Sequence, residues 1–173
     1  MDEEEIVNKC QQGDLMAYRI LYQRYEQPFL RTAFRLLGQQ QEAEDAVQET
    51  FLKLYRRIHN YNCGSKFSTY FFRILINSCY DKLRKRNPEI SSDFDQAGLS
   101  RHSSSELRYS LAEAIAALPD QMRACFVLSA IEGFKQEEIA QVLEINVGTV
   151  KATIHRAKAK LRTWLSASQK EII

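Results

Sequence analysis

The sequence predicts an all-α protein made of two small helical domains joined by a flexible linker. Apolar residues recur almost throughout at the three- and four-residue spacing of a helix face, and no segment alternates apolar and polar residues as a half-buried strand does. The 173 residues include only six Gly and three Pro, too few for a turn-rich all-β fold. Residues 88–105 are serine-rich and lack any period, so we predict domains at 1–87 and 106–173 with this linker between them.

Composition excludes several classes of protein. The net charge is only +2, so any charge signal must be local. No apolar run approaches the roughly 18 residues of a membrane span, and the acidic N-terminus is not a signal peptide. The four cysteines and three histidines are scattered, without the paired spacing of a metal site. We therefore expect a cytoplasmic protein with reduced, mostly buried thiols, no membrane insertion, no metal and no cofactor.

The first long helix is predicted from a stripe of aromatic and aliphatic side chains. Asp14, after Gly13, is its expected N-cap, and Gly38 is its expected stop. Pro28 either kinks this helix or starts a new one that runs to Leu37. The stripe itself comprises Tyr18, Leu21, Tyr22, Tyr25 and Phe29.

The next predicted helix carries two stripes. The apolar one, expected in the core, comprises Ala43, Ala46, Val47, Thr50, Phe51 and Leu54. Beside it Asp45, Gln48, Glu49 and Leu52 form a polar stripe with one apolar member. This second stripe fits a docking face for a partner helix and equally fits a solvated face.

A loop that interleaves aromatic and basic residues follows, and then a third helix with Ser68 as its expected cap. Core packing accounts for Phe71 but leaves four polar or aromatic loop residues unexplained, namely Tyr61, Asn62, Ser65 and Lys66. Aromatic rings offer a stacking surface to unpaired bases, and cations hold the nucleic-acid backbone. The helix ends in the basic run 81–86.

The C-terminal part has the pattern of a helix-turn-helix. A helix stripe that stops at Pro119 and a second one that stops at Gly133 come first. A short helix is then predicted over Gln136–Leu143, with small Ala140 at a close helix crossing. After a tight turn a second helix opens near residues 147–149 and continues past Leu161. In such motifs the second helix enters the major groove by its N-terminal end.

The second helix of this pair is basic. Between residues 147 and 162 it carries Lys151, Arg156, Lys158, Lys160 and Arg162 and no acidic residue. Phosphate contacts would release counterions from DNA, which favours a DNA-binding face. The alternative is a solvated basic face, because helix C-termini favour cations in any case.

At these motifs the sequence resembles the bacterial RNA polymerase sigma factors of the small extracytoplasmic-function group. The resemblance covers about residues 5–165 and rests on four motifs in order. They are Tyr22-Gln23-Arg24-Tyr25, the run from Ala43 to Arg56, the run from Phe67 to Ile74 with Asn77, and Val147 to Lys151 with His155-Arg156-Ala157.

The resemblance implies that the first domain binds core polymerase and recognises and opens the −10 promoter element. Docking on the β′ clamp helices would fall to Asp45, Gln48, Glu49, Leu52 and Arg56. A flipped non-template base would be captured in a loop pocket at Tyr61, Asn62, Ser65, Lys66 and Asn77, with Tyr70 and Arg73 nearby. The residues that would meet the duplex edge are Asn77, Asp81, Arg84 and Lys85.

For the second domain the resemblance implies recognition of the −35 element and docking on the β flap tip. The matching reading positions are Lys151, Ala152, His155 and Arg156, and Thr149 and Lys158 would meet phosphates. The family often has Ser then Arg where this chain has Ala152 and Thr153. Such proteins are usually held inactive by an anti-sigma factor, often membrane-anchored, so an anti-sigma partner is expected.

Two other readings compete with a sigma factor. A helix-turn-helix repressor would need a dimer helix, and none is evident. A pure protein-interaction module would leave the basic helix unexplained. An enzyme with a small-molecule substrate is not expected, because no nucleophile–base pair, phosphate-cradling loop or carboxylate pair appears at useful spacing.

Overall fold

The computed structural model describes residues 2–62, 64–86 and 111–170, and the predicted linker at 88–105 lies outside them. Within these ranges the chain forms eight α-helices with one 3₁₀ turn, one π segment and no strand, which confirms the all-α prediction. Nowhere in the described ranges is a helix both long and apolar enough to cross a membrane. The chain divides into two compact units, and each is described by itself.

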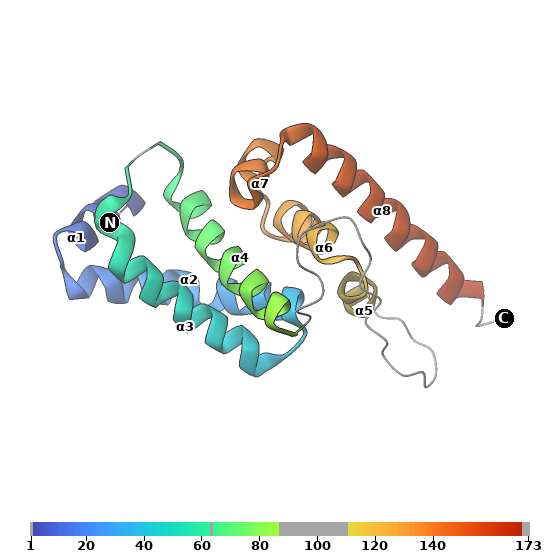
Figure 1. Ribbon diagram of the computed structural model, residues 1–173, viewed down its shortest axis with the longest axis horizontal. Helices are drawn as coiled ribbons and strands as arrows, with labels where there is room; N and C mark the ends of the chain where they lie inside the picture. The colour runs from blue at the N-terminus through green and yellow to red at the C-terminus, as the bar shows by residue number, and fades with distance from the viewer. Residues whose placement is uncertain (1, 63, 87–110, 171–173) are drawn as a thin grey trace. The chain divides into compact units, whose positions relative to one another are not determined.

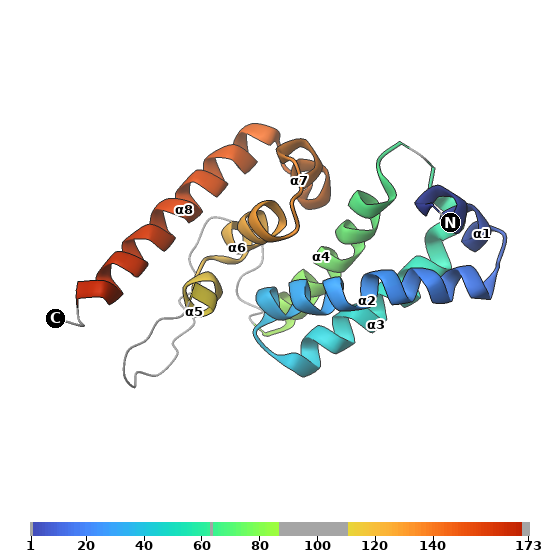
Figure 2. The same cartoon turned by 180° about the vertical axis from the view of Figure 1, so that it is seen from behind.

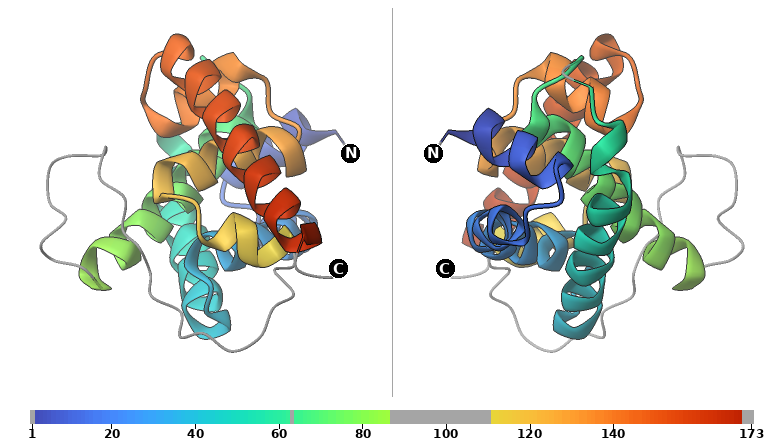
Figure 3. Two further views of the ribbon diagram at one scale, coloured as in Figure 1. Left: turned by 90° about the vertical axis from the view of Figure 1, so that its right-hand side faces the viewer. Right: turned by 90° about the vertical axis from the view of Figure 1, so that its left-hand side faces the viewer.

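The first unit contains four α-helices and the 3₁₀ turn. They are α1 (Glu3–Gln11), α2 (Leu15–Leu37), α3 (Gln40–Arg57), η1 (Ile58–Asn60) and α4 (Phe67–Arg86). Helices α2, α3 and α4 pack against one another, and α1 packs against α2 near its start (Figures 1, 2 and 3). This bundle presents the outer faces of α3 and α4 and the loop between them.

The ends of α2 follow the prediction. The Asp14 carboxylate accepts hydrogen bonds from the backbone N–H groups of Met16 (2.8 Å) and Ala17 (3.3 Å), so it is the N-cap. Gly38 ends the helix with a left-handed φ of 73°, a conformation that costs glycine little.

Two details of helix boundaries differ from the sequence interpretation. Helix α2 runs through Pro28 without starting anew. Buried Tyr25 and Phe29 on either side of the proline anchor both halves in one core, which offsets the missing backbone donor. Helix α4 begins at Phe67, and the Tyr70 N–H already donates to the Lys66 carbonyl at 3.1 Å. Ser68 therefore lies within the first turn and is not the cap.

Aromatic side chains fill the centre of the first unit. The rings of Phe29 and Phe71 are fully buried and lie 4.6 Å apart, edge to face. Tyr25 and Phe72 contact Phe29 at 5.2 and 4.9 Å, and Phe51 contacts Phe71 at 5.2 Å. Such aromatic pairs add to the free energy of burial, so the cluster holds α2, α3 and α4 in register.

The C-terminal part of the chain contains α5 (Leu111–Ala116), α6 (Asp120–Phe126), a π segment (Val127–Ile131), α7 (Gln136–Leu143) and α8 (Val147–Lys170). Helix α8 runs along α5 and α6 (Figure 3). Its buried Ala157 and Leu161 close a core with Ile115, Leu118 and Val127. The predicted helix pair is confirmed, with its turn at Glu144 in a left-handed conformation (φ 56°).

The described cysteines, Cys10, Cys79 and Cys125, are free and buried. Burial raises the pKa of Cys10 to about 11 and the pKa values of Cys79 and Cys125 to about 12. Because the thiolate is the reactive form, these three thiols are packing groups in the folded protein. This agrees with the prediction of reduced, buried thiols; Cys63 lies outside the described residues.

Candidate nucleic-acid interface

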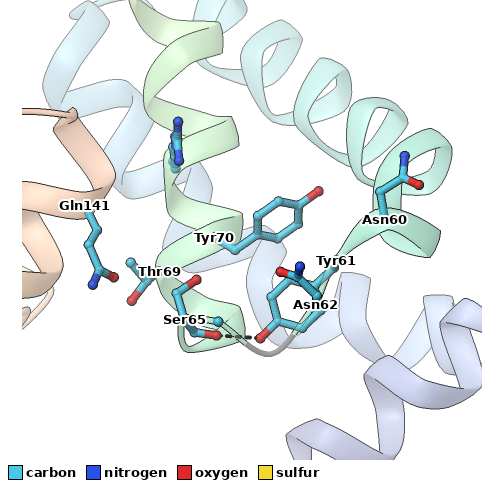
Figure 4. Close-up of a pocket in the computed structure, with 9 residues that line it drawn as sticks. Asn60, Tyr61, Asn62, Ser65, Thr69, Tyr70 and Gln141 are labelled. Atoms are coloured by element: carbon cyan, nitrogen blue, oxygen red, sulfur yellow. Dashed lines mark hydrogen bonds between the residues drawn. The ribbon is translucent and has the colours of Figure 1, made fainter.

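The loop between α3 and α4 is held in place by hydrogen bonds from another part of the chain. The Gln11 side-chain amide, at the end of α1, donates to the carbonyls of Ile58 (2.9 Å) and Tyr61 (2.8 Å). The Tyr61 hydroxyl donates to the Ser65 carbonyl at 2.7 Å (Figure 4), and its ring lies 5.4 Å from that of Phe67. These contacts fix the loop before any ligand binds.

The loop and the first turns of α4 surround a hollow (Figure 4). The residues of the loop and of α4 that line it are Asn60, Tyr61, Asn62, Gly64, Ser65, Thr69, Tyr70 and Arg73. The rings of Tyr61 and Tyr70 lie 5.0 Å apart and tilted by 39°. Burial raises the pKa of the Tyr70 phenol, so it stays a neutral hydrogen-bond donor. Aromatic surface, amides and one guanidinium together suit an unpaired base and its phosphate.

The structure brings together five of the residues expected at the base pocket: Tyr61, Asn62, Ser65, Tyr70 and Arg73. Lys66 belongs to the same loop and is exposed.

The remaining −10 residues lie further along α4, away from the hollow. Asn77, Arg84 and Lys85 are exposed there, and Asp81 accepts a hydrogen bond from Arg84 at 2.6 Å. The expected −10 residues thus form two groups, one around the hollow and one along the second half of α4.

Sequence reasoning missed three residues of this region. Asn60, at the end of η1, and Thr69, in the first turn of α4, line the hollow, but neither residue is part of a sequence pattern that indicates a site. Gln11 lies 47 and 50 positions from its two acceptors, and a glutamine near a helix end carries no sequence signal for such a contact.

The polar stripe of α3 faces solvent. Asp45, Gln48 and Arg56 are exposed, and the Leu52 side chain in their midst is 58% exposed. Glu49 is half-buried and pairs with Lys53 at 2.7 Å. A single exposed leucine among polar side chains fits both interpretations of this stripe, a docking face for a partner and a solvated face.

Helix α8 begins with a side-chain cap. The Asn146 side-chain oxygen accepts from both the N–H (2.8 Å) and the hydroxyl (3.0 Å) of Thr149. The Thr149 hydroxyl proton is therefore engaged within the protein, while the N-terminal end of the helix remains exposed. Val150 and Ile154 are buried on the opposite face, as predicted.

The exposed face of α8 carries the other expected DNA contacts: Lys151, Ala152, His155, Arg156 and Lys158. Thr153 is only 2% exposed. Its side chain therefore faces the core, and the exposed basic residues of α8 are Lys151, Arg156, Lys158, Lys160 and Arg162.

A helical unit with a pre-formed aromatic hollow, followed by a helix-turn-helix with a basic second helix, defines the class of two-domain helical transcription proteins. The Sigma-70 region 2 family model matches residues 21–89, and the Sigma-70 region 4 model matches residues 108–161. The chain belongs to the extracytoplasmic-function (ECF) family of RNA polymerase sigma factors.

Relatives of known function and solved structures are similar along most of their length. The ECF RNA polymerase sigma factor SigW of Bacillus subtilis is 33% identical over 92% of this chain and 94% of that protein. The RNA polymerase sigma-H factor of Pseudomonas aeruginosa is 30% identical over 90% of each. The fold resembles that of CnrH in its complex with the cytosolic domain of CnrY, with a TM-score of 0.71 and 24% identity over 94% of this chain and 96% of that one.

Proposed function

We propose that this chain binds core RNA polymerase and directs it to promoters that carry a −35 and a −10 element. It is an initiation factor and not an enzyme, because phosphodiester synthesis belongs to the polymerase. The observation that carries the proposal is the pre-formed hollow around Tyr61 and Tyr70, in a chain that also carries the basic face of α8.

Polymerase binding is assigned to the exposed face of α3. Leu52 would form the apolar centre of the contact with the β′ clamp helices, and Asp45, Gln48, Glu49 and Arg56 would form the polar rim around it. The second domain would dock on the β flap. Two weak DNA contacts then suffice, because polymerase holds both domains over one promoter and raises the effective concentration of each.

Promoter opening is assigned to the hollow and to the outer face of α4. Tyr61 and Tyr70 would stack on an extruded −10 base, while Asn62 and Ser65 would bond its edge and Arg73 its backbone. Lys66, Asn77, Arg84 and Lys85 would follow the strand. Since the hollow exists without DNA, little ordering free energy opposes capture of the base.

Recognition of the −35 element is assigned to the exposed start of α8. Lys151, Ala152, His155 and Arg156 would face the base edges, while Thr149 and Lys158 would lie at phosphates. Because Asn146 accepts from both the N–H and the hydroxyl of Thr149, Thr149 would favour a phosphate only through its place at the positive end of the α8 dipole.

We place residues 1–87 and 106–173 in the two domains, with 88–105 connecting them, and we place the protein in the cytoplasm with its polymerase. An anti-sigma factor is proposed as the regulatory partner. CnrH, with 24% identity to this chain, was solved with the cytosolic domain of CnrY. RpoE of Bartonella quintana, with 23% identity and a TM-score of 0.69 over 86% of this chain and 96% of that one, was solved with the anti-sigma factor NepR.

The test compares promoter opening by reconstituted holoenzymes. Tyr61→Ala and Asn77→Ala should leave binding to the −35 duplex and core affinity unchanged but lower the permanganate reactivity of the −10 thymines. Asn8→Ala removes an exposed helical amide on α1 and is the matched control for Asn77→Ala. Normal opening by both variants would refute the assignment of the −10 surface.

A further inference from the structure

Four side chains of alternating charge connect α3 to α4. Glu49 lies 2.7 Å from the Lys53 ammonium, Lys53 lies 3.6 Å from Asp81, and Asp81 lies 2.6 Å from Arg84. We call these four residues the charge chain. Its two ends lie on different proposed surfaces, since Glu49 belongs to the polymerase-binding face and Arg84 to the promoter-binding face.

Helix geometry explains the arrangement. Glu49 and Lys53 are four residues apart on α3, and Asp81 and Arg84 are three apart on α4, so each pair shares a helix face. Packing of α3 on α4 brings the two pairs together. The hydroxyl of fully buried Ser78 lies 3.1 Å from the Lys53 nitrogen and orients it between the two carboxylates.

Within the charge chain, two cations share two carboxylates. Lys53 divides its charge between Glu49 and Asp81, and Asp81 divides its charge between Lys53 and Arg84. If a cation of a partner takes Glu49, Lys53 is left to Asp81 alone. Asp81 then holds Arg84 less strongly, and the guanidinium becomes available to a DNA phosphate.

We propose that Lys53 is a positioning residue that couples polymerase binding at Glu49 to release of Arg84 for the promoter. The inference rests on the proposed function, because it needs polymerase on α3 and DNA on α4. This coupling makes the affinity of the free protein for DNA lower than that of the holoenzyme, because Arg84 stays paired with Asp81 until polymerase binds.

Other ion pairs between α3 and α4 lie beside the charge chain. Asp45, also on the proposed polymerase face, lies 3.8 Å from Lys82 of α4. Glu42 pairs with Arg86. Acids of α3 thus hold cations of α4 at two positions beside the charge chain. In the charge chain the cross-helix pair has the opposite polarity, with Lys53 of α3 on Asp81 of α4, and Asp81 in turn holds Arg84. A partner that binds Asp45 would release Lys82 in the same way.

The effect must be modest, because the charge chain is partly solvated. Side-chain exposure is 42% for Glu49, 26% for Lys53, 43% for Asp81 and 61% for Arg84. Ion pairs of this kind change equilibria by about two- to five-fold. Coupling of that size is reciprocal for binding equilibria, and a double-mutant cycle measures it.

The first experiment removes the Lys53 charge. Lys53→Met keeps the apolar stem, Lys53→Arg keeps the charge, and Lys9→Met is a control with the same change in net charge on α1. At saturating core polymerase, Lys53→Met should reduce permanganate reactivity at −10 by about two- to five-fold. Lys53→Arg and the control should behave as wild type. Adding Asp81→Asn to Lys53→Met should restore opening, because Arg84 then has no carboxylate to hold it.

The second experiment does not depend on how Lys53→Met folds. Asp81→Asn alone should raise the affinity of the free protein for a single-stranded −10 oligonucleotide by about two- to five-fold. In holoenzyme the gain should be smaller, because polymerase has already released Arg84. Equal gains in both states would overturn the proposal.

Two further results of the first experiment would also overturn it. One is a Lys53→Met defect that Asp81→Asn does not relieve, and the other is a defect that disappears at saturating core. Wild-type protein that neither binds core nor opens promoters would refute the proposed function itself. Normal wild-type activity with variants that match the Lys9→Met control would refute the coupling alone.

Discussion

Gln11 is expected to control promoter opening although it lies on α1, outside every motif. Its amide holds the base-binding loop through two hydrogen bonds, to the Ile58 and Tyr61 carbonyls at 2.9 and 2.8 Å. Gln11→Ala removes both donors. Gln11→Glu keeps the shape but points a carboxylate at two carbonyl oxygens, so it should be the more damaging change. Gln12→Ala, next to it and exposed, is the control.

The size of the effect follows from the two bonds. We call the loop conformation in which Gln11 makes both hydrogen bonds the closed loop. A typical protein hydrogen bond contributes about 1 kcal/mol net, so Gln11→Ala should destabilise the closed loop by about 2 kcal/mol. If capture of the base needs the closed loop, opening falls by at most about 30-fold at this free energy. The loss is smaller where the closed loop remains the major form, because Tyr61 still bonds the Ser65 carbonyl at 2.7 Å.

The assay is permanganate reactivity of −10 thymines with saturating holoenzyme, beside a titration of core affinity. Opening should fall in the order Gln12→Ala, Gln11→Ala, Gln11→Glu, while core affinity stays constant, because α3 is untouched. Hydrogen exchange at loop amides should accelerate in the same order. Unchanged opening in Gln11→Glu, or equal losses of opening and core affinity, would refute the reasoning.

Three other predictions follow from the exposed and buried side chains. Leu52→Ala should weaken core binding by about 1–2 kcal/mol without changing the melting temperature. Leu15→Ala, at an exposed leucine of α2, should change neither core binding nor the melting temperature. Equal effects of the two variants in a core titration would contradict the assigned face. Lys158→Ala should lower the salt dependence of −35 binding by about one counterion, whereas Lys151→Ala and Arg156→Ala should weaken binding and relax the sequence preference at −35. An unchanged slope for Lys158→Ala in a filter-binding series would remove it from the phosphate contacts. Burial raises the pKa of the Cys79 thiol to about 12 from 9.0, so its contribution to stability is present below pH 9 and is lost as pH rises. At pH 10 the loss is on the order of 1 kcal/mol, and denaturant unfolding of Cys79→Ala should lack this component.

Helix faces and most helix ends could be predicted because they depend on local sequence. The apolar stripes, the Asp14 cap and the Gly38 stop each involve residues within one or two turns of one another. The effect of Pro28 could not be decided locally. Whether a proline ends a helix depends on what both halves pack against, and here Tyr25 and Phe29 contact the same core.

The candidate site likewise has a part that local sequence predicts and a part that it does not. Tyr61, Asn62, Ser65, Tyr70 and Arg73 are close in sequence, and their types indicated a base-binding loop. Gln11 and the charge chain depend on how helices distant in sequence pack, which no single motif encodes. The start of α7 is stabilised without a capping side chain at Lys135. The Glu138 carboxylate accepts from the Lys135 backbone N–H at 2.8 Å and satisfies one helix-end donor.

The measurement that tests the central claim most directly is transcription by core polymerase mixed with this protein, on a library of fragments of its own genome. The account predicts discrete start sites that share paired upstream elements, and loss of those transcripts with Tyr61→Ala. Absence of specific transcripts and of core binding, with folded protein free of any inhibitor, would contradict it.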